Sequence, residues 1–155
     1  MTLKAYYWKC SVWAAILNTV SIITYLFLRH YSNTWILYIG NLLFSATVLI
    51  GVFRGNHRVH DTASVRSLFM MGFKITIYGI LIAIVLCALV LIINSMFTGL
   101  NYQAGNPAQS GRYDILFTIL SNTIAVNGAL GALAALIGST VVKKNQKTEQ
   151  GKTLY

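Results

Sequence analysis

The sequence predicts an all-α membrane protein, a bundle of four transmembrane helices with both termini in the cytoplasm. Of its 155 residues, 56% are hydrophobic and only 10% are charged, whereas a soluble domain carries about a quarter of its residues as charges. Four runs without a charged residue are each long enough for a transmembrane helix of about 20 residues: 10–28, 30–53, 75–111 and 115–142. These runs do not alternate polar and apolar residues, which excludes the strands of a membrane barrel.

The predicted transmembrane domain covers residues 1–142 and precedes a polar, basic cytoplasmic tail, 143–155. Its spans are expected at about 7–28, 33–53, 69–97 and 113–142. The first span is longer than the apolar core of about 7–15 residues in a signal peptide and has no small-residue cleavage site, so we expect it to be retained. The third connection, 99–111, contains three glycines and the only proline, a composition typical of turns.

The third span is expected to begin before its apolar run. Asp61 or Thr62 can cap a helix, and no helix-breaking residue lies between there and Lys74. A helix from Thr62 to Phe97 would be about 54 Å long at 1.5 Å per residue, which exceeds the hydrocarbon thickness of a bilayer. We therefore expect its first turns to project into the cytoplasm or to lie along the membrane surface, with Leu68 and Met71 offering apolar contact there.

The distribution of basic residues predicts the orientation. Four spans place the N-terminus, the second connection and the tail on one side, which carries ten of the twelve Lys and Arg; the other side has only Arg29 and Arg112. Basic residues are enriched on the cytoplasmic side, so we predict a multi-pass protein of the inner (plasma) membrane with both termini inside. Six of these residues are expected to contact anionic lipid headgroups: Arg54, Arg58, Arg66, Lys74, Lys143 and Lys144.

Three asparagines, Asn18, Asn41 and Asn127, are predicted to form a polar layer inside the membrane. Because the hydrocarbon offers no water as a hydrogen-bond partner, we expect their amides to face one another inside the bundle. Interhelical hydrogen bonds of this kind contribute about 0.6–2 kcal/mol each. The other interpretation is a polar path for an ion or a small solute. We favour the structural role, because no charged residue or histidine accompanies them at mid-depth.

Small residues form a regular pattern along the fourth span. They recur in steps of four, three, four, three and four residues: Ser121, Ala125, Gly128, Ala132, Ala135 and Ser139. A seam of this kind allows another helix backbone to approach closely. The seam is expected to pack within the monomer, and the alternative is a contact with another subunit.

Several functional classes lack the residues that they need. A metal site requires three or four converging ligands, and the second connection offers only His57, His60 and Asp61. A membrane haem requires histidines on facing spans, and a drug exporter of four spans requires an embedded carboxylate, whereas Asp61, Asp114 and Glu149 all lie outside the predicted spans. We expect no enzyme activity, no cofactor and no nucleic-acid partner.

The layout also carries a resemblance. A basic second connection, the sequence Gly72-Phe73-Lys74 at the start of the third span, and Lys143-Lys144 after the last span resemble a family of small four-span bacterial inner-membrane proteins that is catalogued as a domain of unknown function. The sequence departs from that family in its third connection, which is more acidic in such proteins. The resemblance implies a four-span bundle and no catalytic residue.

These observations predict a non-enzymatic integral membrane protein, an accessory or assembly subunit that binds other membrane proteins or itself. The alternative is a small oligomeric transporter or channel with an uncharged polar lining. The asparagine layer distinguishes them, because transport requires the amides to line water, whereas an accessory role predicts amides that are hydrogen-bonded and dry.

Overall fold

The computed structural model describes residues 3–27, 35–58, 64–97 and 117–152. The elements are α1 (Leu3–Phe27), α2 (Trp35–Arg58), α3 (Val65–Phe97), a π-helical turn η2 (Asn122–Val126) and α5 (Asn127–Lys152). Residues 117–121 are α-helical as well, so η2 lies inside one long helix. Four helices are long and apolar enough to cross a membrane: Ala5–Leu26, Trp35–His57, Val65–Val90 and Phe117–Lys144. The prediction of an all-helical chain with four helices of spanning length is confirmed.

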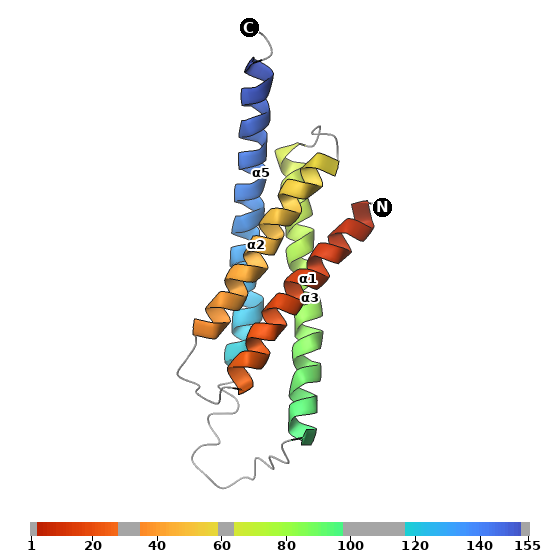
Figure 1. Ribbon diagram of the computed structural model, residues 1–155, viewed down its shortest axis with the longest axis vertical. Helices are drawn as coiled ribbons and strands as arrows, with labels where there is room; N and C mark the ends of the chain where they lie inside the picture. The colour runs from red at the N-terminus through yellow and green to blue at the C-terminus, as the bar shows by residue number, and fades with distance from the viewer. Residues whose placement is uncertain (1–2, 28–34, 59–63, 98–116, 153–155) are drawn as a thin grey trace.

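The helices alternate in direction and form a bundle (Figure 1). α1 packs against α2 and α3, and α5 packs against the same two helices. The start of α1, the end of α2, the start of α3 and the end of α5 lie at one end of the bundle, which we call the basic end. The two predicted connections at the other end, 29–32 and 99–111, lie outside the described residues.

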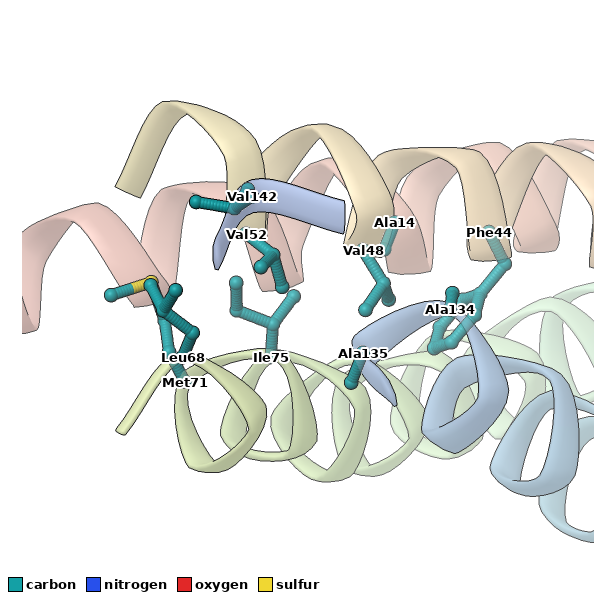
Figure 2. Close-up of a cluster of buried hydrophobic side chains, with 10 residues drawn as sticks. All are labelled: Ala14, Phe44, Val48, Val52, Leu68, Met71, Ile75, Ala134, Ala135 and Val142. Atoms are coloured by element: carbon teal, nitrogen blue, oxygen red, sulfur yellow. The ribbon is translucent and has the colours of Figure 1, made fainter. Parts of the chain in front are cut away.

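Two clusters of buried hydrophobic side chains fill the bundle. The larger cluster lies toward the basic end and draws on all four long helices (Figure 2): Ala14, Phe44, Val48, Val52, Leu68, Met71, Ile75, Ala134, Ala135 and Val142. The smaller cluster lies toward the opposite end: Ile22, Tyr25, Leu37, Cys87 and Ile119. Large apolar side chains also cover the outside, among them Leu42, Leu81 and Leu133, which are 66%, 55% and 53% exposed. A bundle that is apolar on both its inner and outer surfaces is suited to a lipid environment.

Small residues bring α3 and α5 into close contact within the larger cluster. A Cβ atom added at Gly72 of α3 would lie 2.5 Å from the Cβ and 3.0 Å from the Cα of Ala135. A Cβ added at Gly131 of α5 would collide with the side chain of Thr76. α3 runs through Gly72 as one helix. These positions therefore accept no larger side chain without a shift of the helices.

α3 differs from its prediction at its start. It begins at Val65, and the hydroxyl of Ser64 accepts a hydrogen bond of 3.2 Å from the backbone N–H of Ser67. Ser64 is therefore the N-cap of the described helix, whereas the predicted cap residues Asp61 and Thr62 lie outside the described residues. Leu68 and Met71 are 0% and 2% exposed. They extend the core instead of meeting the membrane surface, because α2 and α5 also reach this level of the bundle.

α5 also differs from its prediction. The predicted span ends at residue 142, but the helix continues to Lys152 and its last part extends beyond the other helices (Figure 1). Residues 143–150 are mostly Lys, Gln and Glu, which have high helix propensity. The polar residues after 142 end the predicted transmembrane span, but they do not end the helix.

Candidate functional site

A polar layer separates the two hydrophobic clusters. It consists of Asn18 on α1, Asn41 on α2, Asn122 on η2 and Asn127 on α5, with 1%, 1%, 8% and 0% of their surfaces exposed. Along each helix the asparagines follow a residue of one cluster and precede a residue of the other. Asn18, for example, lies between Ala14 of the larger cluster and Ile22 of the smaller one. The layer is thus part of the bundle interior.

Asn41 and Asn122 form a reciprocal pair across the bundle. The Asn41 Nδ2 donates to the Asn122 Oδ1 at 2.8 Å, and the Asn122 Nδ2 donates to the Asn41 Oδ1 at 3.0 Å. Each amide thereby makes one donor and one acceptor contact in the bundle interior. This pair is the interhelical bond that the sequence predicts for Asn41, but its partner is Asn122, which the prediction missed.

The π-helical turn explains why Asn122 was missed. In an α-helix, residues five apart differ by about 140° in direction, so Asn122 and Asn127 cannot both face the core. In the structure the N–H of Asn127 donates to the carbonyl oxygen of Asn122, the bond of a π-turn. This turn holds one more residue than an α-helical turn and brings both amides to the interior. Asn122 is an amide within a predicted span, and this alone indicates that it faces the interior. Regular α-helical periodicity, however, places it on a different face from Asn127.

Asn18 and Asn127 lie in the same layer without such a pair. The Oδ1 and Nδ2 atoms of both side chains are buried and have no hydrogen-bond partner among the described residues. Asn18 faces α2, because its Oδ1 would lie 3.4 Å from a Cβ added at Gly40. An unsatisfied amide in a hydrocarbon environment costs several kcal/mol. The expected mutual pairing of Asn18, Asn41 and Asn127 is therefore not what the structure has, and two amides keep their full hydrogen-bonding capacity.

The predicted small-residue seam divides into an inner and an outer part. Ala135 and Ser139 are buried, whereas Ser121, Gly128 and Ala132 are half-buried and Ala125 is exposed. A Cβ added at Gly128 would meet only the Cδ1 of Ile80, at an ordinary 3.8 Å. The close contacts are made by Gly131, Ala135 and Gly138 instead. The π-turn separates Ser121 and Ala125 from the rest of the seam, and within α5 the seam lies inside the bundle only at Ala135 and Ser139.

Most of the cations that were predicted to contact lipid lie on the outside of the basic end. Arg54, Arg66, Lys74 and Lys144 are exposed, and Lys143 is half-buried. The side chain of Arg58 lies outside the described residues.

Residues that could carry redox or metal chemistry are dispersed. Cys10 is half-buried and Cys87 is buried, and both are free thiols. Within the part of the chain that the structure describes, no three His, Cys, Asp or Glu residues come together. His57 is exposed on α2, whereas His60 and Asp61 lie outside the described residues.

In the comparisons with known proteins, no family model, no curated protein and no solved structure matches this chain. The resemblance to a four-span family of the inner membrane therefore stays a prediction.

Proposed function

We propose that this protein is a non-enzymatic accessory or assembly subunit of the inner membrane, which binds other membrane-embedded helices through an outward face of its last helix. That face, the small face, consists of Ala125, Gly128, Ala129 and Ala132. The observation that carries the proposal is the open space at Gly128, where an added Cβ would touch only one atom, at 3.8 Å.

The way helices pack in lipid explains why the small face is suited to binding another helix. Lipid tails are as apolar as leucine, so helices in a membrane associate through close van der Waals contact, which small residues permit. Gly131 and Ala135 already use this contact inside the monomer. The small face is not used in this way, and Leu133 and Leu136 beside it are 53% and 51% exposed. A second helix could approach α5 here as closely as α3 does on the inside.

The test is purification in a mild detergent, followed by identification of the associated membrane proteins and by measurement of self-association. Ala125→Ile adds bulk at an exposed position, so the monomer should keep its melting temperature while the associated subunit is lost. Leu133→Ile is the matched control, because it keeps a large apolar side chain beside the small face, and it should keep the partner. An Ala125→Ile protein that retains every associated subunit would show that the face contacts lipid only.

A small oligomeric transporter or channel is the second candidate, and the unpartnered amides of Asn18 and Asn127 favour it. Both side chains have donors and acceptors that a passing polar solute could use. Asn18→Leu and Asn127→Leu should then change solute flux in proteoliposomes while the protein stays folded. Unchanged flux in both variants would remove this candidate and would leave the accessory role unaffected.

The cytoplasmic location of both termini is part of the proposal and rests on the excess of Lys and Arg at the basic end. In a background without native cysteines, a single cysteine at position 57 or 150 should react only from the cytoplasmic side. One at position 103 should react only from outside. The opposite labelling pattern would invert the orientation.

A further inference from the structure

The outer surface between α1 and α2 contains a groove with a volume of about 370 Å³. This lies within the range of about 300–1,000 Å³ that is usual for small-molecule sites. One wall is a stripe on α1 with a spacing of four residues: Lys9, Trp13 and Leu17. The other wall is a stripe on α2: Thr47, Ile50 and Arg54.

The antiparallel course of the two helices (Figure 1) places both charged residues of the groove at the same end. Lys9 lies near the start of α1 and Arg54 near the end of α2, so both cations are at the basic end. Leu17 lies about 12 Å further along α1 than Lys9, at a rise of 1.5 Å per residue, so the groove extends this far from the cations. Trp13 and Ile50, which are 54% and 50% exposed, line the walls below the cations.

A hydrogen bond between α1 and α2 lies next to the charged end of the groove. The hydroxyl of Tyr6, which also lines the groove, donates a hydrogen bond of 3.1 Å to the carbonyl oxygen of Gly51. Tyr6 is 6% exposed, so this bond is shielded. It connects α1 and α2 at the level of the cations. Neither α1 nor α2 contains an acidic residue, so the positive charge of the groove is not neutralised by its own helices.

We propose that this groove is a binding site for one anionic phospholipid. Lys9 and Arg54 hold the headgroup phosphate, since an arginine guanidinium and a lysine ammonium are the usual phosphate ligands in proteins. Trp13, Leu17 and Ile50 contact the upper part of an acyl chain. A free phosphate would use the two cations and leave the apolar walls exposed, so the combination favours a lipid. The site is independent of the small face on α5 and of the function proposed above.

The test is native mass spectrometry of the full-length protein in detergent, with phosphatidylglycerol and phosphatidylcholine of identical acyl chains. We expect one phosphatidylglycerol to be retained in preference to phosphatidylcholine. The double variant Lys9→Gln/Arg54→Gln should weaken this binding about 25-fold, since a basic residue near an anionic surface contributes roughly a factor of five. The matched control is Arg66→Gln/Lys74→Gln, which removes two exposed cations from α3 at the same end and should retain the lipid.

A third variant tests the apolar half separately. Thr47→Trp fills the deep end of the groove and leaves both cations in place, so it should also lose the lipid, with a melting temperature near that of the original protein. Inorganic phosphate at millimolar concentration should not displace phosphatidylglycerol. Equal retention of the two lipids, equal losses in the two charge variants, displacement by phosphate, or a second protein copy bound in place of a lipid would each overturn the proposal.

Discussion

The helix contacts at two levels of the bundle are stabilised in different ways. Toward the basic end, α3 and α5 meet through Gly72 and Gly131 at distances that leave no room for a further carbon atom. In the polar layer, the helices are joined by the amide pair of Asn41 and Asn122. The contact between α3 and α5 depends on shape, whereas the contact between α2 and η2 in the polar layer depends on hydrogen bonds. The bundle therefore responds to added volume at one level and to lost polar groups at another.

The largest effect is expected at Gly72. In Gly72→Val, the new side chain meets the backbone of Ala135 and the side chain of Val52, and neither can move far because both are fully buried. Overpacking of this kind costs about 1–3 kcal/mol and occasionally more. We expect about 3 kcal/mol in the free energy of unfolding, measured by denaturant titration in detergent. A loss below about 1 kcal/mol would mean that the contact between α3 and α5 is not tightly packed.

The next largest effect is expected in the polar layer. Asn41→Leu leaves the amide of Asn122 buried without its partner, which should cost about 1–3 kcal/mol. The double variant Asn41→Leu/Asn122→Leu removes both amides and should recover part of that loss. Unfolding free energies of the two single variants and the double variant form a cycle, for which we expect a coupling of about 0.6–1.7 kcal/mol. A coupling near zero would contradict the pair.

A smaller effect of opposite sign is expected on α5. Gly128→Ala adds a methyl group where there is open space, and alanine in a helix is favoured over glycine by about 0.5–1 kcal/mol. The variant should be slightly stabilised in a thermal unfolding assay. Gly131→Ala is its control, because the same methyl group would collide with Thr76, and it should be destabilised. The same sign in both variants would show that the two faces of α5 are equivalent.

The smallest loss of stability is expected at Asn18. Its amide has no hydrogen-bond partner among the described residues, so Asn18→Leu removes a buried polar group without breaking a bond. The change should cause no loss of stability and should stabilise the protein by the desolvation cost that the unpaired amide carries, in contrast to Asn41→Leu. A loss as large as that of Asn41→Leu, measured in the same assay, would indicate that this amide has a partner in the membrane and would weaken the transport candidate.

The sequence by itself determined the number of spanning helices and the gathering of most basic residues at one end. Both follow from the bilayer, because it requires about 20 apolar residues for each crossing. The burial of Asn41 was also predictable, since an amide within a span avoids lipid by turning inward.

Only the tertiary structure decided which groups meet. Helical periodicity placed Gly128 on the packing seam, but the close contact with α3 is made by Gly131, one turn further along the helix. The π-turn at residues 122–126 provides Asn122 as the partner of Asn41. Lys9 and Arg54 lie 45 residues apart in the sequence, and the antiparallel packing of α1 and α2 brings them to one groove. The physical reason is common to all three cases. Local pattern sets the axis and the polarity of a helix, whereas its rotation and its neighbours depend on how the side chains of all four helices fit together.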